Sequence, residues 1–587
     1  MKVIILFVVL YQRYGANSVP EVNLPELGIL RGSQTVSAFS RRSIYQFLSI
    51  PYGETTAGEY RFRAPRKALP WRGVRNVSHF GLPCPQLTTV SLNSSQSSVQ
   101  DLEDCLTLSV FTGDLSSRNP VMVFLQGRSA SRDGGTVQTG EFLLEKEIVL
   151  VVVQYRFGPF GFLALKTEGM PGNVGLLDIK LALEWVQSNI RKFGGDDENV
   201  TLFGQSAGAA AVSALLYSPL VPDGLFHKVI LQSGASSSPW VWDMDPVGNT
   251  LKIATITGCS TSAEHSEKNF EAVQECLRGI DAGRLLSSFV AHKMKTTKNK
   301  GLRQVGGNRF IVQDYYGLIP RVPLEAGNPR RGLPMMAGVV EHEGTFLLTS
   351  IYDALMGSGL LANRTFVKHR LLDRINQILG IDDPTGVLVG YQISTLFSMD
   401  QLESGDFDRL KDGLIDMIGT ATVKAPLLRE AQVNSLANPS GTFLYTFDYS
   451  GDQTRFGYGA DTSHYPFRGG VHHSDDLLYL FPFPPGKPGL SEKDAEISHM
   501  MVDLWTSFCA TGVPSSEANG VVWKPMTDYA GPYLRISQNP HHGTNFYQEF
   551  SAVSRKEERK SPKAKINEPN QNPQSVVPEI LIIQNPN

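Results

Sequence analysis

Short apolar runs, many of them β-branched, alternate with helical periodicity between residues 121 and 346. Continuous apolar runs of about four to eight residues are typical of strands buried on both faces of a sheet. Five such strands are predicted, at Val121–Leu125, Ile148–Gln154, Val200–Phe203, Val229–Leu231 and Met335–Val340. Their alternation with helices predicts an α/β fold with a mostly parallel central sheet and helices on both faces.

Helical spacing of apolar residues is clearest in Leu177–Phe193, which the pair Gly194-Gly195 ends. Later in the chain, strands are predicted at Thr442–Tyr449 and Tyr533–Ile536, and a helix near Ile497–Ala510. The region between, about residues 350–440, has a helical pattern and is predicted to form a cap over the sheet.

The two ends of the chain differ in character from the rest. Lys2 precedes an apolar run, Val3–Tyr11, and the small residues Ala16 and Ser18 follow, so residues 1–18 are predicted to be a secretory signal. A buried first strand is the alternative. Residues 551–587 are rich in charged residues, Asn, Pro and Gln, and this composition predicts a disordered tail. Residues 19–550 are left as one folded domain.

Composition excludes some classes of function. The formal charge is 54 − 57 = −3, which argues against a strongly basic nucleic-acid binder. No internal run approaches the ~18–20 apolar residues that span a bilayer, so no membrane span is expected. With 41% hydrophobic and 19% charged residues, the chain has the composition of a globular protein.

Five cysteines fit an oxidising compartment. Cys84 and Cys105 lie 21 residues apart and Cys259 and Cys276 lie 17 apart, which suits two local disulfides with Cys509 left over; five buried thiols are the alternative. There is no CxxC motif and no Cys/His cluster, so neither a structural zinc site nor a cofactor is indicated. Of four glycosylation sequons, Asn199 lies at the start of a strand, and glycans are expected at the others, Asn76, Asn93 and Asn363.

The sharpest chemical motif is Gly204-Gln205-Ser206-Ala207-Gly208. A predicted strand precedes it and an Ala-rich helical stretch, Ala209–Tyr217, follows it, which is the strand–turn–helix context of a nucleophile elbow. The glycines permit the sharp turn, and the turn raises the serine hydroxyl above the sheet at a helix N-terminus. Ser206 is therefore a candidate nucleophile; the alternative is a serine that caps an ordinary helix.

A serine nucleophile needs a base, usually a histidine held by an acid, in the chain order Ser, Asp/Glu, His. Glu343 follows a predicted strand within the segment Gly338–Gly344, which also contains His342, and Gly470–Phe481 contains His472 and His473. Any of the 12 histidines is a possible base from the residues alone, and a single histidine is more often structural.

A series of ordered blocks resembles the type B carboxylesterase and cholinesterase family across about residues 22–550. The blocks are Arg61-Phe62, Glu103-Asp104-Cys105-Leu106, Tyr155-Arg156, Gly161-Phe162-Leu163, Gly172-Asn173 with Asp178, Phe193-Gly194-Gly195-Asp196, the elbow, and Leu231-Gln232-Ser233-Gly234. The resemblance implies an α/β-hydrolase fold and an acyl-enzyme mechanism. It places the nucleophile on Ser206, the acid on Glu343 and, by the spacing to Tyr479, the base on His473. Both cysteine pairs match family disulfides, which leaves Cys509 unpaired.

The chain departs from the family pattern where the oxyanion hole is expected. The family carries a run like His-Gly-Gly-Gly at the position of Gln126-Gly127-Arg128-Ser129. Backbone N–H groups of Arg128, Ser129 and Ala207 are the expected oxyanion donors, although glycine reaches backbone angles that Arg and Ser reach only with strain. Gln205 stands where many members have Glu, and juvenile hormone esterases resemble this chain in having Gln there. Pro85–Asp104 has no aromatic residue to hold a quaternary ammonium, which argues against a cholinesterase.

Two functions remain open. The first is a secreted serine esterase that hydrolyses a small-molecule ester. The second is a non-catalytic member that binds a protein partner, because the family includes adhesion proteins such as neuroligins, neurotactin and glutactin. The complete set Ser206, Glu343 and His473 favours the enzyme.

Overall fold

The computed structural model describes residues 19–86, 102–127, 138–260, 269–299, 310–320, 332–381, 390, 395–456, 462–482, 489–517 and 520–546. Within these residues the main sheet has eleven strands in the order β18-β17-β14-β13-β12-β11-β7-β8-β6-β4-β3. The strands are β3 (Ser33–Val36), β4 (Ser43–Pro51), β6 (Thr107–Thr112), β7 (Asn119–Leu125), β8 (Val149–Val153), β11 (Gly195–Gln205), β12 (Lys228–Gln232), β13 (Met335–Val340), β14 (Thr442–Phe447), β17 (Tyr533–Ile536) and β18 (His541–Gly543).

The centre of this sheet is parallel and its edges are antiparallel. Every neighbouring pair from β8 to β17 is parallel, whereas β6, β4 and β3 on one side and β18 on the other pair antiparallel. Parallel strands point their carboxyl ends to one edge, so the loops after β11, β13 and β14 meet there. The predicted α/β-hydrolase fold with a mostly parallel sheet is confirmed.

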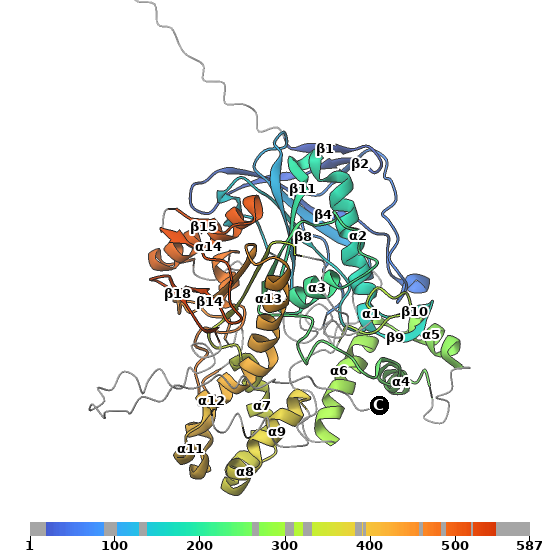
Figure 1. The fold of residues 1–587 in the computed structure, drawn as a ribbon. Helices are drawn as coiled ribbons and strands as arrows, with labels where there is room; N and C mark the ends of the chain where they lie inside the picture. The colour runs from blue at the N-terminus through green and yellow to red at the C-terminus, as the bar shows by residue number, and fades with distance from the viewer. Residues whose placement is uncertain are drawn as a thin grey trace, which may run out of the picture.

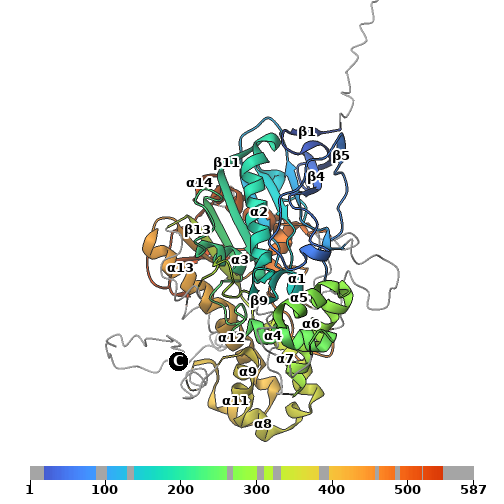
Figure 2. The same ribbon diagram turned by 90° about the vertical axis from the view of Figure 1, so that its right-hand side faces the viewer.

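Both faces of the sheet are buried, as the continuous apolar runs predict. In β7, Val121, Val123 and Leu125 join the core under α2 and α3, while Met122 and Phe124 join the core under α14. The helices lie on the two sides of the sheet in both ribbon views (Figures 1 and 2). A β-strand alternates its side chains between faces, so a strand covered on both faces has no polar side to show in the sequence.

The helices fall into a group on the sheet and a group in the cap. On the sheet and beside it lie α1 (Gly158–Phe162), α2 (Val174–Asn189), α3 (Ala207–Leu216), α4 (Pro246–Thr257), α5 (Phe270–Gly279), α6 (Ala282–Asn299), α13 (Ala425–Ala437) and α14 (Glu492–Thr511). The cap contains α7 (Thr345–Gly357), α8 (Arg364–His369), α9 (Leu371–Leu379), α11 (Met399–Ser404) and α12 (Phe407–Gly419), which share a separate apolar core. Helices α8, α9 and α11 lie at the end of the molecule opposite to β1 (Figures 1 and 2).

Short strands and turns complete the fold. They are β1 (Glu21–Leu24), β2 (Gly28–Arg31) and β5 (Val74–Asn76) in one small sheet, the pairs β9 (Ala164–Thr167) with β10 (Met170–Pro171) and β15 (Ser515–Ser516) with β16 (Val521–Val522), the 3₁₀ turns η1 (Gly58–Tyr60), η3 (Leu143–Glu145), η4 (Ile190–Phe193), η7 (Leu360–Ala362) and η9 (Asp475–Tyr479), and the π-helical turn η8 (Thr420–Lys424).

The predicted elements agree with these bounds apart from their ends. The helix predicted over Leu177–Phe193 starts earlier, at Val174, and its last turn is the separate 3₁₀ turn η4. Gly194 ends it with φ 77°, a left-handed angle that glycine adopts without strain. The strand predicted as Val200–Phe203 extends over Gly195–Gln205, because Gly195 already pairs with Asn119 at the start of β7, before a register shift that precedes Val200.

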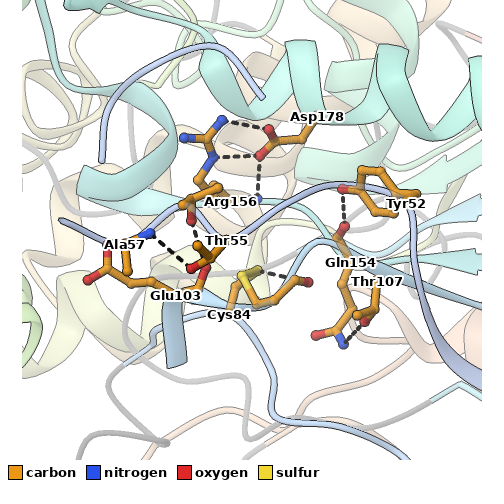
Figure 3. The surroundings of a disulfide bond; sticks show 11 residues. Tyr52, Thr55, Ala57, Cys84, Glu103, Thr107, Gln154, Arg156 and Asp178 are labelled. Carbon is orange, nitrogen blue, oxygen red and sulfur yellow. Dashed lines mark hydrogen bonds and ion pairs between the residues drawn. A yellow bond between two sulfur atoms is a disulfide. The ribbon is translucent and has the colours of Figure 1, made fainter. Parts of the chain in front are cut away.

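A buried ion pair connects the end of β8 to α2. Arg156 donates from Nε to Asp178 Oδ2 at 2.8 Å and from Nη2 to Oδ1 at 2.6 Å, and both side chains are buried (Figure 3). A bidentate pair of this kind satisfies two buried charges together, which an apolar interior requires. The same view contains Cys84, which forms one of the two disulfides, with Cys105 (Figure 3).

Candidate active site

Ser206 lies at the tip of a sharp turn between β11 and α3. Its backbone has φ 56° and ψ −121°, a combination that a residue with a Cβ adopts only when the surroundings enforce it. The turn is closely packed, since a Cβ on Gly204 would lie 2.5 Å from the Gly208 carbonyl carbon and one on Gly208 would lie 2.0 Å from the Leu125 oxygen. The two glycines of the motif are therefore required by the packing of the turn.

The structure brings the three predicted residues together. The Ser206 hydroxyl lies 2.9 Å from His473 Nε2, and His473 Nδ1 lies 2.6 Å from Glu343 Oε2. A carboxylate oxygen only accepts, so Nδ1 carries the hydrogen and Nε2 presents its lone pair to the serine. Glu343 is itself fixed, because Oε1 accepts the Val340 N–H at 3.0 Å. This is the geometry of a serine, a base and an acid that orients the base.

The His473 loop is held by its neighbours in the chain. His472 donates from Nδ1 to the His473 carbonyl oxygen at 2.9 Å, and the backbone N–H of His472 donates to Asp475 Oδ2 at 2.8 Å. Ser474 between them has φ 73°. Burial, followed by repulsion from His473, lowers the pKa of His472 to about 3, so this ring is neutral. Burial raises the pKa of Asp475 to about 7, although the hydrogen bonds that it accepts favour its charged form.

Two further side chains contact the histidine ring. Gln205 places its amide Nε2 3.3 Å from His473 Nε2, so the base nitrogen faces a neutral donor as well as the serine. The Phe346 ring stacks on the imidazole with the ring centroids 5.3 Å apart. The sequence indicated Gln205 only as a departure from the family, and it gave no signal for Phe346.

A buried carboxyl group lies behind the site. Asp476 Oδ2 accepts hydrogen bonds from Gln232 Nε2 at 2.8 Å and from the Tyr445 hydroxyl at 3.2 Å. Burial raises the pKa of Asp476, and the negative charge of Glu343 adds to this effect while His473 opposes it. Sequence reasoning did not assign a role to this residue.

The expected oxyanion region is described only in part. Ala207 is buried at the first position of α3, beside Ser206. Gly127 closely approaches the elbow, since a Cβ there would lie 2.2 Å from the Gln205 oxygen and 3.2 Å from the Ala207 nitrogen. The end of β7 thus leads directly to the serine. Arg128 and Ser129 lie outside the described residues.

The remaining predicted sites concern covalent modification. Cys84–Cys105 and Cys259–Cys276 form disulfides, and Cys509 is a buried free thiol whose pKa burial raises to about 11. The Asn199 side chain contacts Lys228 and donates to the Ala510 oxygen at 3.1 Å. Asn76 and Asn363 are exposed, and Asn93 lies outside the described residues.

The described ranges contain neither a cluster of metal-ligand side chains nor a long apolar helix. Among these residues no three His, Cys, Asp or Glu side chains gather as metal ligands would. No helix in the same part of the chain is long and apolar enough to cross a membrane.

Comparison with known proteins places these features in a family. The family model described as "Carboxylesterase family" matches residues 18–554. Relatives include Glutactin of Drosophila melanogaster (31% identity, 91% of this chain and 52% of that protein), liver carboxylesterase of Sus scrofa (29%, 88% and 90%) and juvenile hormone esterase of Tribolium castaneum (31%, 84% and 84%). The chain spans about half the length of Glutactin and most of the two esterases. With this match over residues 18–554, the chain belongs to the carboxylesterase family.

Proposed function

We propose that this protein is a secreted serine carboxylic-ester hydrolase that works through an acyl-enzyme intermediate. The observation that carries the proposal is the continuous series of hydrogen bonds from Ser206 through His473 to Glu343. It begins at a serine whose backbone is held at φ 56° on a tightly packed turn. Esterases among the relatives are consistent with this chemistry.

The proposed reaction has two halves. Ser206 Oγ attacks the ester carbonyl carbon while its proton moves to His473 Nε2, and Glu343 stabilises the imidazolium that forms. The tetrahedral intermediate collapses when His473 returns the proton to the alkoxy oxygen, so the alcohol leaves and an acyl-serine remains. Water then attacks the acyl carbon with His473 again as base, and the carboxylic acid is released as Ser206 regains its proton.

The negative charge on the tetrahedral oxygen needs donors that are fixed in advance. We assign this role to the backbone N–H groups of Ala207, Arg128 and Ser129. Ala207 is at the N-terminus of α3, where the helix dipole also favours negative charge. The close approach of Gly127 to the elbow supports a contribution from the loop that follows it.

Secretion is proposed on three features. Residues 1–18 have the pattern of a signal peptide, and the two disulfides are typical of an oxidising compartment. Asn76 and Asn363 are exposed sequons that are open to glycosylation, as we also propose for Asn93. The contacts of the Asn199 amide with Lys228 and Ala510 argue against a glycan there.

A second candidate is a non-catalytic binding protein with a protein partner. The similarity to Glutactin favours it, as does the presence of Arg128 and Ser129 where the family has glycines. Both candidates use the same fold, so the discriminating property is the reactivity of Ser206.

Labelling the purified protein with a fluorophosphonate probe tests the proposal. We expect one labelled residue, Ser206, and loss of labelling and of p-nitrophenyl acetate hydrolysis in Ser206→Ala. Ser233→Ala is a matched control, because Ser233 is a buried serine at the end of the next strand with φ 53°. A folded wild-type protein that is not labelled would refute the esterase and favour the binding protein.

A further inference from the structure

Two lysine side chains are buried among the described residues, Lys228 and Lys424. Lys424 is the more buried, with 2% of its surface exposed, and it lies in the π turn η8 between α12 and α13, whereas Lys228 lies at the start of β12. A buried ammonium group is costly unless charges of opposite sign surround it. The position of Lys424 therefore requires an explanation that the sequence does not supply.

The backbone explains why this lysine points inward. Pro426 lacks an N–H group, so the Thr422 carbonyl oxygen has no donor four residues later and accepts the Trp240 Nε1–H at 2.9 Å instead. The helix widens here into the π turn η8 (Thr420–Lys424), and the next residue, Ala425, donates to the Thr420 oxygen five residues back. A π turn inserts one residue and rotates the helical turn after it, and such turns are frequent at functional sites.

Acidic groups from three parts of the chain act on the Lys424 ammonium. Its Nζ lies 3.9 Å from Asp416 Oδ1 of α12, a distance typical of a charge pair rather than of a direct hydrogen bond. Burial lowers the pKa of Lys424, and the negative charges that oppose this come, in decreasing order of effect, from Asp416, Glu343, Glu341 and Asp448. Asp448 is itself paired with Arg535 of β17.

The π turn is packed against the turn that carries the acid. A Cβ added to Gly344 would lie 2.0 Å from the Ile415 oxygen and 2.8 Å from the Gly419 nitrogen. A Cβ added to Gly419 would lie 3.2 Å from Glu343 Cβ. Asp416, the charged neighbour of Lys424, directly follows Ile415 in α12, so the Lys424 ammonium lies on the segment that packs against the Glu343–Gly344 turn.

We propose that Lys424 is a positioning residue whose buried positive charge keeps the Glu343–His473 pair unprotonated and so extends its action as a base to lower pH. The inference rests on the proposed function and adds to it the residue that sets the acidic limit of the site. A nearby positive charge makes uptake of a proton by the pair less favourable, whichever of the two residues holds that proton. Removal of the charge therefore raises the pH at which the pair takes up its first proton.

The other charged and titratable residues near the pair are not changed by the substitution. They are Glu341 and His342 beside Glu343, His472 and Asp475 beside His473, Asp476 behind the site, Arg455 near His472, and Asp416, Asp448 and Arg535 around Lys424.

The test measures the titration of the His473 imidazole directly, by NMR of protein labelled with ¹³C at histidine, with the resonance assigned from its loss in His473→Gln. In Lys424→Met we expect the midpoint of this titration to rise by about one pH unit. Lys424→Arg keeps the charge and is expected to keep the wild-type midpoint. Lys228→Met is the matched control, because it removes the other buried lysine at the start of β12, and its midpoint is expected to be unchanged.

A purely structural role would give a different pattern. Lys424→Met would then lower Tm without moving the His473 midpoint, and that result overturns the proposal. If the single variant does not fold, Lys424→Gln takes its place, since it removes the charge but keeps a polar side chain; a raised midpoint supports the proposal and a wild-type midpoint overturns it. The titration needs no turnover, so loss of the proposed esterase function would appear separately, as an unlabelled Ser206.

Discussion

Replacement of Gln205 by Glu is the sharpest perturbation that the site offers. Gln205 is buried, and its Nε2 lies 3.3 Å from His473 Nε2, the nitrogen that we propose accepts the serine proton. Glutamate has the same shape but places a carboxylate oxygen where the amide nitrogen now lies. The change therefore adds one negative charge beside the base without altering the packing.

The distance sets the size of the effect. Two unit charges 3.3 Å apart attract by about 1.3 kcal/mol at the dielectric constant of water and by about 5 kcal/mol at an effective value of about 20. The lower figure corresponds to about one pKa unit. Burial of the new carboxylate offsets part of the larger figure. In the pH profile of kcat/KM, we therefore expect the acidic limb, where the rate falls as His473 takes up a proton, to shift by about one to three units to higher pH.

The assay is kcat/KM for p-nitrophenyl acetate between pH 5 and 9, or the rate of fluorophosphonate labelling where turnover is slow. At pH 6 we expect the Gln205→Glu protein to be at least about tenfold slower than wild type and to recover at high pH. Gln205→Met is the control, since it removes the amide without adding a charge and is expected to keep the wild-type limb. A folded Gln205→Glu protein with an unmoved limb would refute the placement of Gln205 at the reactive nitrogen.

Two further predictions concern His472 and the oxyanion loop. Because the pKa of His472 is lowered to about 3 by burial, the unfolded chain binds its proton below about pH 6.5 while the folded protein does not, so this residue destabilises the fold as pH falls from about 6.5 towards 3. His472→Gln should therefore reduce the loss of unfolding free energy between pH 7 and 5 by about 2 kcal/mol in reversible urea unfolding, and equal losses in the two proteins would contradict it. For the loop, Arg128→Gly with Ser129→Gly is expected to raise hydrolysis of a small acetate ester by at least about tenfold, because glycine reaches without strain the backbone angles that the family's oxyanion loop uses. No gain in a folded double variant beside an active wild type would show that the native loop already donates.

The fold class and the candidate nucleophile could be predicted from the sequence because both depend on residues that are close together in the chain. The strands at Val121–Leu125 and Met335–Val340 are apolar throughout because helices cover both faces of the sheet, and this burial is visible as a continuous run. The elbow is equally local, since Gly204 and Gly208 lie within two residues of Ser206 and permit the turn themselves. Strands β3, β4 and β6 were not predicted: β3 and β4 at the edge are only partly buried, and their mixed patterns carry a weaker signal.

Contacts between distant parts of the chain were decided by the tertiary structure. The residues alone left any of the 12 histidines as a possible base, and the family resemblance favoured His473 over its neighbour His472. The structure brings His473 to Glu343, 130 residues away, and turns His472 to the adjacent backbone carbonyl. The Gln205 contact spans 268 residues. The position of Lys424 could not be predicted from the sequence either. Pro426 indicates an irregular helix, but the packing of α12 against the Glu343 turn decides that Lys424 lies near Glu343. Periodicity and turn chemistry are properties of neighbouring residues, whereas the charge around an active site depends on which segments the completed core brings into contact.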